Sequence, residues 1–332
     1  MALRIGINGF GRIGRNVLRT AWSRDDVEFV HINDLTDDES LAYLLAHDSV
    51  HKGFGSDVKA VDGGLSIDGK VVPTSAERDP AAIPWAKHGV DVVLECTGVF
   101  TSRDGAAKHL EAGAKKVIIS APGKGVDGTY VYGVNHTDYR PEETVISNAS
   151  CTTNCLAPFA KVVDELVGID HGMMTTIHAY TMNQSLLDAP SKKDPRRGRA
   201  AAVNMVPTST GAAKAIGLVL PHLAGRLHGM AVRVPTPNVS LVDLVFTARR
   251  DTTAEEINAA LEAAAAGPMK GVLEATHVPV VSSDLIGNPH SSIVDLALTS
   301  VIGGNIVKIL SWYDNEWGFS NRMVDLALHV GA

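Results

Sequence analysis

The 332-residue sequence lacks features that define several protein classes. It has only three cysteines (Cys96, Cys151 and Cys155), too few for a disulfide framework, and no Cys/His spacing typical of a zinc site. No apolar run reaches the roughly 18 residues that a membrane helix needs. The first residues turn glycine-rich too early for a secretory signal. We therefore expect a cytoplasmic protein, kept reduced and without a metal site.

The chain also lacks an excess of positive charge. It has 30 Lys and Arg against 37 Asp and Glu, a net charge of −7, which argues against nucleic acid as the primary partner. One segment, residues 191–199, carries five positive charges and one negative, and a solvated surface loop is its ordinary interpretation. If the substrate is an anion, individual arginines must attract it.

The first 150 residues alternate apolar strand patterns with helical ones. Such alternation, with continuously apolar strands, predicts an α/β domain whose parallel sheet is covered on both faces. Turn signals inside residues 58–72 predict hairpins. The predicted strands are 3–8, 27–33, 90–96 and 116–120, and the predicted helices are 11–24, 40–47 and 103–112.

The pattern changes near residue 150. Longer, more alternating runs follow, and they predict an α+β catalytic domain with a mixed or antiparallel sheet and helices on one face. The predicted strands are 172–179, 230–234, 239–248 and 306–312, and the predicted helices are 151–166, 254–266 and 316–330. We expect domains at 1–150 and 151–315, with the helix in 316–332 returning to the first domain.

A glycine motif follows the first predicted strand and opens the first predicted helix. Gly9, Gly11 and Gly14 form GxGxxG, and in this context they suit a tight turn, close approach to a pyrophosphate, and helix–strand packing, respectively. Asp34 ends the second strand, where a carboxylate accepts hydrogen bonds from ribose hydroxyls and repels a 2′-phosphate. The sequence therefore predicts a Rossmann-type domain that binds NAD.

Cys151 is the strongest candidate for a reactive residue. It stands where a predicted loop becomes a helix, and a helix N-terminus lowers the pKa of a thiol. Cys155 lies one turn further in and Cys96 ends an apolar strand, so both fit buried structural cysteines. His178, at the end of a predicted strand, is a candidate partner for a thiolate–imidazolium pair, with a structural role as the alternative.

Seven motifs, in order and at matching separations, resemble those of the phosphorylating glyceraldehyde-3-phosphate dehydrogenases over essentially the whole chain. They are INGFGRIGRN (7–16), NDLTD (33–37), SNASCTTNCLAP (147–158), HAYT (178–181), STGAAKA (209–215), RVPTPNVSLVDL (233–244) and SWYDNEWGFSNR (311–322). The resemblance implies oxidation of D-glyceraldehyde 3-phosphate to 1,3-bisphosphoglycerate with reduction of NAD. It makes Cys151 the nucleophile, which carries a hemithioacetal and then a thioester, and His178 the base and later acid.

The same resemblance implies the binding residues. For the cofactor they are Arg12 and Ile13 in the phosphate loop, Asp34, Arg78 and Ser120 on the adenosine side, and Asn315 at the nicotinamide. For the substrate phosphate they are Thr181, Arg197 and Arg233, with Arg196 as the alternative to Arg197, and for inorganic phosphate Ser150, Thr152, Thr210 and Gly211. The family's basic loop packs against a neighbouring subunit, which implies a homotetramer.

Two alternatives stay open at this point. An erythrose-4-phosphate dehydrogenase shares the cysteine, the histidine and the fold but transfers its acyl group to water. An RNA-binding secondary role through residues 192–199 is the non-enzymatic alternative. Residues 192–199 lack the interleaved aromatic residues on which nucleic-acid bases stack.

Overall fold

A computed structural model describes residues 1–191 and 194–331, which form two compact units. The first unit contains Met1–Tyr132, His136–Ala149 and the C-terminal residues from Ser320, and the second contains Gly133–Asn135 and Ser150–Phe319. Within the described residues, no helix is both long enough and apolar enough to span a membrane.

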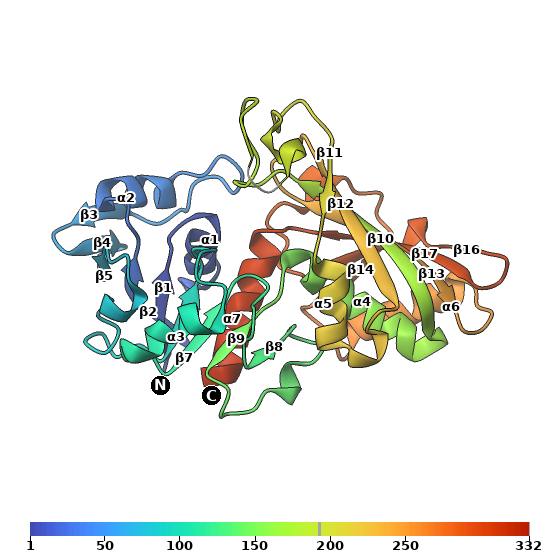
Figure 1. The fold of residues 1–332 in the computed structure, drawn as a ribbon, viewed down its shortest axis with the longest axis horizontal. Coiled ribbons are helices and arrows are strands. Elements are labelled where there is room, and N and C mark those ends of the chain that lie inside the picture. Colours follow the sequence, from blue (N-terminus) through green and yellow to red (C-terminus); the bar gives the residue numbers. More distant parts are fainter. Residues whose placement is uncertain (192–193, 332) are drawn as a thin grey trace. The chain divides into compact units, whose positions relative to one another are not determined.

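The first unit is built on a mainly parallel sheet. Its strands are β1 (Leu3–Asn8), β2 (Val27–Asn33), β3 (Val58–Val61), β4 (Gly64–Ile67), β5 (Lys70–Ser75), β6 (Val92–Glu95), β7 (Lys116–Ile119), β8 (Gly128–Thr129) and β9 (Val145–Ser147). Among the described residues they follow the order β3-β4-β5-β2-β1-β6-β7-β9-β8 (Figure 1). Only β3, β4 and β5 pair antiparallel, as the turn signals of residues 58–72 predict.

Helices cover both faces of this sheet. They include α1 (Arg12–Ala21), α2 (Asp38–Ala46), α3 (Arg103–Glu111) and most of α7 (Trp317–Gly331), with 3-10 turns η1 (Pro80–Ala82) and η2 (His136–Asp138). The crossover from β1 to β2 and the crossover from β6 to β7 step in opposite directions along the sheet. Because such crossovers are right-handed, α1 and α3 lie on opposite faces.

The C-terminal helix returns to the first unit, as predicted. Asp325 on α7 lies 3.7 Å from Arg24, just beyond the end of α1. A Cβ on Gly331 would be 2.3 Å from Leu3, so the end of α7 packs closely on β1. The last helix is therefore part of the same compact unit as the first strand.

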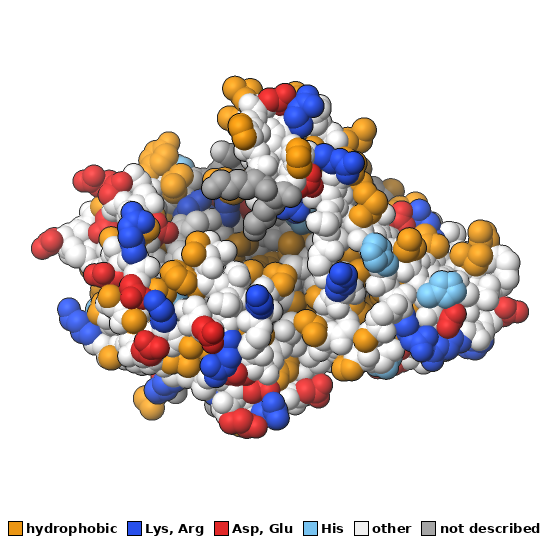
Figure 2. All heavy atoms as spheres, in the orientation of Figure 1, with side chains coloured by type: hydrophobic (Ala, Val, Ile, Leu, Met, Phe, Trp, Pro, Cys, Tyr) orange, Lys and Arg blue, Asp and Glu red, His pale blue; other side chains and the backbone are white. Residues whose placement is uncertain are grey.

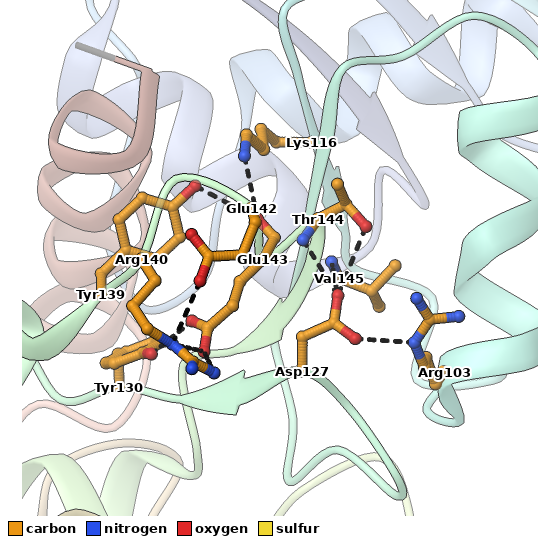
Figure 3. A network of polar contacts seen from close by, with 10 residues as sticks. All are labelled: Arg103, Lys116, Asp127, Tyr130, Tyr139, Arg140, Glu142, Glu143, Thr144 and Val145. Carbon is orange, nitrogen blue, oxygen red and sulfur yellow. Dashed lines mark hydrogen bonds and ion pairs between the residues drawn. The ribbon is translucent and has the colours of Figure 1, made fainter.

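Asp127 fixes the segment that leads to the last parallel strand (Figure 3). Its carboxylate accepts hydrogen bonds from Arg103 Nε at 2.7 Å, Thr144 N at 2.9 Å and Val145 N at 3.0 Å. Burial alone would raise the pKa of Asp127, but these hydrogen bonds outweigh it and lower the pKa to about 2. The start of β9, which runs to Ser147 just before the candidate cysteine, is thus bound to an ionised side chain.

Glu143 anchors the same segment from the other side (Figure 3). It is buried, and it accepts hydrogen bonds from the Tyr130 hydroxyl and, at 2.8 Å, from Arg140 Nη2. Lys116 Nζ donates to its backbone carbonyl at 2.9 Å. These contacts tie the chain before β9 to β7.

The second unit contains a mixed, mostly antiparallel sheet, which confirms the predicted fold class. Its strands are β10 (Ile169–Ala179), β11 (Val206–Ser209), β12 (Leu227–Val234), β13 (Ser240–Ala248), β14 (Leu273–Thr276), β15 (Ser292–Asp295), β16 (Ser300–Ile302) and β17 (Ile306–Tyr313). Among the described residues the order is β11-β12-β10-β13-β17-β15-β14, with β16 beside β17. Parallel pairing joins only β10 to β12 and β14 to β15.

Three helices pack on one face of this second sheet. They are α4 (Cys151–Val167), α5 (Ala212–Val219) and α6 (Ala254–Ala266), and the 3-10 turns are η3 (Pro195–Gly198), η4 (Pro221–Leu223), η5 (Ser282–Leu285) and η6 (Leu296–Leu298). Along β10 the side chains alternate: Met174, Thr176 and His178 are buried, whereas Met173 is 66% exposed. The buried face carries the candidate histidine.

Candidate functional site

Each of the three glycines in the phosphate loop is explained by a different structural feature. Gly9 has φ +90°, and a Cβ there would lie 2.7 Å from Thr97 N, so the tight turn excludes a side chain. A Cβ on Gly14 would lie 2.2 Å from the carbonyl oxygen of Gly9, so helix and loop pack in direct contact. A Cβ on Gly11 would meet no atom within 4 Å. The space beside Gly11 suits a pyrophosphate at the helix N-terminus.

Asp34 lies at the same edge of the sheet. Its carboxylate accepts hydrogen bonds from Phe10 N at 2.7 Å and Thr36 N at 2.9 Å, which fix its orientation beside the glycine loop. The Arg12 side chain forms an ion pair with Asp48, which leaves the helix start itself to contact a phosphate. The features of this unit therefore fit a dinucleotide: the backbone N–H groups of a helix start without a side-chain cap, open space beside Gly11, and an accepting carboxylate just after β2.

The remaining candidate cofactor residues lie in helix α1 and in several loops. Ile13 is in the first turn of α1 and is half-buried, whereas Arg78 is exposed in the loop after β5. Ser120 directly follows β7, and its backbone N–H donates to Glu95 O at 3.0 Å. In the second unit, Asn315 is buried, and its side-chain oxygen accepts a hydrogen bond from Ser240 Oγ at 2.8 Å.

Helix α4 presents Cys151 as its first residue. Ala149 has φ +56°, an unusual left-handed conformation for alanine, and it turns the chain from β9 toward the helix. Ser150 is the N-cap, and its hydroxyl accepts a hydrogen bond from Thr153 N at 3.1 Å. The thiol is half-buried, at the positive end of a 17-residue helix.

The structure brings Cys151 and His178 together. The Cys151 Sγ atom lies 3.6 Å from His178 Nε2. On the other side of the ring, Nδ1 lies 2.7 Å from Ala179 O and 2.9 Å from Arg233 Nη1. The Ala179 carbonyl oxygen can only accept, so Nδ1 donates to it, and Arg233 Nη1 donates to the same oxygen at 3.0 Å. We therefore assign the ring proton to Nδ1, which leaves the Nε2 lone pair facing the thiol.

Burial shifts both members of this pair toward the neutral form. It lowers the pKa of His178 to about 3, and the positive charge of Arg233 acts in the same direction. Burial also raises the pKa of the Cys151 thiol, while Arg233 opposes that rise. The sequence offered a thiolate–imidazolium pair as a candidate beside a structural role for His178, whereas burial favours thiol and imidazole at rest. Transfer of one proton from Sγ to Nε2 would then form the ion pair.

The other two cysteines lack such a setting. Cys155 is fully buried, and its Sγ lies 3.6 Å from Ser311 O. Burial raises the pKa of Cys155 to about 12 and that of Cys96 likewise to about 12. Within one helix, then, the thiol at the N-terminus faces a base and the thiol one turn later does not.

Arg233 contacts the candidate histidine, and Thr181 and the charge of Arg197 act on Arg233. Arg233 Nη1 lies 3.4 Å from Thr181 Oγ1, and its Nε is buried with no partner among the described residues. The charge of Arg197 contributes to lowering the pKa of Arg233, so the two guanidinium groups repel each other. An anion between the two guanidinium groups would relieve that repulsion. It would also accept a hydrogen bond from Arg233 Nε.

The start of α5 forms a second candidate anion site. Gly211 is its N-cap without a side-chain bond, and a Cβ there would meet nothing within 4 Å. Thr210 Oγ1 accepts from Ala212 N at 3.2 Å. Arg197 is held beside this segment, with its Nε 2.9 Å from Thr208 Oγ1. Lys192 and Lys193 of the basic segment lie outside the described residues.

Two residues that position the site were not among the sequence-based candidates. Tyr313 is buried, its hydroxyl lies 2.9 Å from Thr152 Oγ1 and from Thr176 Oγ1, and its ring meets the His178 ring edge-on at 5.9 Å. Ser240 accepts from Ala179 N at 3.0 Å and donates to Asn315. Both lie within recognised motifs, but only the strand pairing shows what they contact.

Comparison with known proteins covers most of the chain. Residues 3–103 match the family described as glyceraldehyde 3-phosphate dehydrogenase, NAD binding domain, and residues 150–315 match its C-terminal domain. The chain is 58% identical over 331 residues to glyceraldehyde-3-phosphate dehydrogenase 1 of Bacillus subtilis, covering 99% of this chain and 98% of that protein. It is 57% identical over 333 residues to the Geobacillus stearothermophilus glyceraldehyde-3-phosphate dehydrogenase, covering 100% and 99%.

Proposed function

The chain belongs to the glyceraldehyde-3-phosphate dehydrogenase family, and on that premise we propose which of its residues carry out the reaction. It is an NAD-dependent oxidoreductase that oxidises glyceraldehyde 3-phosphate and joins the acyl product to inorganic phosphate, forming 1,3-bisphosphoglycerate. The observation that carries the assignment of the reacting residues is the 3.6 Å separation between Cys151 Sγ and His178 Nε2.

Cys151 is the nucleophile and His178 the proton carrier. Nε2 takes the thiol proton as Sγ attacks the aldehyde carbon, and returns it to the carbonyl oxygen, which gives a hemithioacetal. Nε2 then removes the hydroxyl proton as the carbonyl re-forms, which leaves a thioester on Sγ. NAD, when bound, supplies the acceptor for the hydride that leaves this carbon. Phosphate attacks the thioester, and the thiolate departs as the acyl phosphate forms.

The arginines of the second unit neutralise the negative charge of the substrate phosphate. Thr181, Arg197 and Arg233 bind the phosphate of the substrate, since they combine two cations, a hydroxyl and a buried N–H without a partner. Inorganic phosphate binds at the starts of α4 and α5, where the set is Ser150, Thr152, Thr210 and Gly211. In this structure the Thr152 hydroxyl is bonded to Tyr313, so it contributes by orienting the helix start.

The loops of the first unit bind NAD, and the resemblance to the family adds Asn315 to the set. The set comprises Gly9, Gly11, Arg12, Ile13, Gly14, Asp34, Arg78, Ser120 and Asn315. Asp34 accepts hydrogen bonds from the ribose hydroxyls and repels a 2′-phosphate. We place the cofactor domain at residues 1–150, the catalytic domain at 151–315 and the returning helix at 316–332.

The protein acts as a homotetramer in the cytoplasm. The sheet face of the second unit that α4, α5 and α6 leave uncovered carries apolar side chains: Met173, Met230, Val245 and Ile306 are 66%, 41%, 36% and 41% exposed. In the loop after β10, Leu186 and Leu187 are 79% and 76% exposed. A second copy of the chain suits both surfaces, because exposed apolar patches mark interfaces. Three free cysteines suit a reducing compartment.

The deciding experiment measures NADH formation from glyceraldehyde 3-phosphate with and without phosphate or arsenate. We expect sustained turnover only with the anion, and an acyl phosphate as the product. Turnover independent of phosphate, with a carboxylate product from erythrose 4-phosphate, would favour the alternative dehydrogenase. A solution mass equal to four chains tests the tetramer.

RNA binding is the weaker candidate function. Acidic and basic side chains are mixed over the face drawn in Figure 2, and the net charge is −7. No binding to RNA at moderate salt would remove this candidate, whereas an affinity that falls steeply with salt would support it.

A further inference from the structure

A chain of buried polar side chains lies beneath the loops proposed to hold NAD. Asn8 ends β1, Asn33 ends β2 and Glu95 ends β6, and each is at most 3% exposed. Gly9 and Asp34 directly follow the first two. The polar chain thus lies at the carboxyl edge of the parallel strands, the edge at which open α/β sheets bind their ligands.

Hydrogen bonds link the three strand ends. Asn33 Nδ2 donates to Asn8 Oδ1 at 2.8 Å, and Asn8 Nδ2 donates to Glu95 Oε2 at 2.5 Å. Asn33 Oδ1 accepts from Ser75 Oγ and from Glu77 N, each at 2.8 Å, so the chain extends to the end of β5. Both asparagines use their oxygen and their nitrogen, which leaves little freedom for either side chain to rotate.

The carboxylate of Glu95 is surrounded by donors only. Oε1 accepts from Thr97 N at 2.8 Å and from the Thr97 hydroxyl, and Oε2 also accepts from His109 Nε2 at 3.1 Å. Trp85 Nε1 donates to His109 Nδ1 at 3.0 Å. Since an indole N–H can only donate, the imidazole donates to Glu95 through Nε2. With Asn8, four donors meet two oxygens, an arrangement that an amide cannot reproduce.

Thr97 connects the carboxylate to the glycine loop. The turn at Gly9 packs against Thr97 so closely that a Cβ on Gly9 would lie 2.7 Å from Thr97 N and 2.8 Å from its methyl group. The same Thr97 N–H donates to Glu95, and its hydroxyl accepts from Val99 N at 3.0 Å. Glu95 therefore sets the position of the surface against which the phosphate loop turns.

We propose that Glu95 is a positioning residue for NAD binding, which holds the loops after β1, β2 and β6 in register through Asn8, Asn33 and Thr97. It does not touch the cofactor; it acts through the backbone of Gly9 and Asp34. This inference rests on the proposed cofactor site. Its consequence is that one buried carboxylate controls affinity for the cofactor more than it controls the chemistry at Cys151.

The test is calorimetric titration of NAD into the purified full-length protein, together with steady-state kinetics. Glu95→Gln places an amide N–H against a donor, so we expect the dissociation constant for NAD to rise about 10-fold, as loss of one hydrogen bond to a charged group predicts. The turnover number at saturating NAD and the KM for the aldehyde should change less than about threefold by the same argument.

Val117→Ala is the matched control. Val117 on β7 is fully buried in the same unit, and its side chain makes no hydrogen bond to Glu95. The variant should lower the unfolding temperature while leaving NAD affinity unchanged. Equal losses of affinity in Val117→Ala and Glu95→Gln, or unchanged affinity in Glu95→Gln, would overturn the proposal.

A second pair of variants decides the matter if Glu95→Gln does not fold. Thr97→Ser keeps the hydroxyl that donates a hydrogen bond to Glu95, whereas Thr97→Val removes this hydroxyl with little change in side-chain size. We expect the valine variant to bind NAD several-fold more weakly than the serine variant; equal affinities would overturn the proposal. Asp34→Ala must also weaken binding, because unchanged affinity there would disprove the cofactor site and this inference with it.

Discussion

Helices α1 and α4 both begin just after a parallel strand, yet their first turns are built differently. At α4, the Ser150 hydroxyl caps the helix and Cys151 occupies the first position. At α1, the N-cap is Gly11, with no side-chain cap and open space beside it. One helix start holds a thiol that belongs to the protein, Cys151, which becomes an anion when His178 takes its proton. The other is left for an anion that arrives with a ligand.

The remaining helices extend this comparison. Asp37, Ser102 and Thr253 cap α2, α3 and α6 with their side chains. Helix α5 instead starts at Gly211, again without a side-chain cap at that residue. We propose that phosphate groups bind at both helix starts with a glycine cap, those of α1 and α5, and also at the start of α4, which Ser150 caps. A helix start without a side-chain N-cap therefore indicates a ligand site when a second feature, such as Asp34 or Arg197, lies beside it.

The largest expected effect comes from removing the Cys151 thiol at the start of α4. Cys151→Ser should abolish turnover, because a hydroxyl does not ionise near neutral pH, and NAD affinity should stay nearly intact. Cys155→Ser is the control on the same helix and should keep most activity, since that thiol is buried with its pKa raised to about 12. Assays of NADH formation and of NAD binding on both variants decide it; appreciable turnover by Cys151→Ser would exclude the thiolate mechanism.

Next in size is the loss of the base that faces α4. His178→Asn should lower turnover by about 10²–10⁴-fold, the usual contribution of general acid–base catalysis. Alkylation of Cys151 at neutral pH should also slow. Because burial lowers the pKa of His178 to about 3 and raises that of the thiol, wild-type alkylation should rise with pH without a step near pH 6.5. A clear step at that pH would instead indicate an ion pair at rest.

Converting the open helix start into a closed one is the sharpest test of the comparison. Gly11→Ser should let a hydroxyl cap α1 as Ser150 caps α4, and the new Cβ meets no atom. The cap competes with the pyrophosphate, so NAD affinity should fall about 10- to 100-fold, which corresponds to loss of one charged hydrogen bond of about 1.5–3 kcal/mol. The unfolding temperature without NAD should not fall. Unchanged affinity in titrations would place the pyrophosphate elsewhere.

Asp127 provides an internal measure of what one guanidinium and two backbone N–H groups together do for an anion. Its pKa of about 2, against the ordinary 3.8, means that its stabilising effect is present above about pH 4 and is lost as pH falls toward 2. Asp127→Asn should lower the free energy of unfolding by about 2 kcal/mol at pH 7, as this shift implies. Denaturation at pH 7 and pH 3 checks it: the difference from wild type should shrink at the lower pH.

The smallest effect concerns the cap of α4. Ser150→Ala should lower the free energy of unfolding by about 1 kcal/mol, the usual cost of losing a side-chain N-cap. It should also raise the KM for inorganic phosphate, because the same hydroxyl belongs to the proposed phosphate set. Ser102→Ala at α3 is the control, with a similar loss of stability and no change in KM. If the two variants had equal kinetics, Ser150 would be a cap only.

The sequence predicted the framework of both units because their long strands carry strong local patterns. The predicted strands 3–8 and 27–33 coincide with β1 and β2, and the predicted helix 254–266 coincides with α6. Short elements such as β14, β15 and α5 were not predicted, since four to eight residues give too weak a periodicity. Their conformation depends on pairing and packing with neighbouring elements, which local sequence does not reveal.

The candidate site likewise has features that local sequence predicts and contacts that it does not. The position of Cys151 at a helix start follows from local sequence, and so does the glycine loop. The contact between Cys151 and His178, and the one between Glu95 and Asn8, join residues that are 27 and 87 positions apart. Such pairs depend on strand order and register, which composition and spacing do not determine. The preferred protonation state of Cys151 and His178 depends on burial and could not be foreseen either.

The left-handed backbone at Ala149 limits how this part of the sequence can change during evolution. A buried position with φ +56° accepts glycine without strain, excludes β-branched residues by conformation, and excludes large residues by lack of room. Insertion or deletion of a residue between β9 and α4 would rotate the first turn of the helix and with it the thiol. The spacing from strand to nucleophile is therefore as constrained as the nucleophile itself.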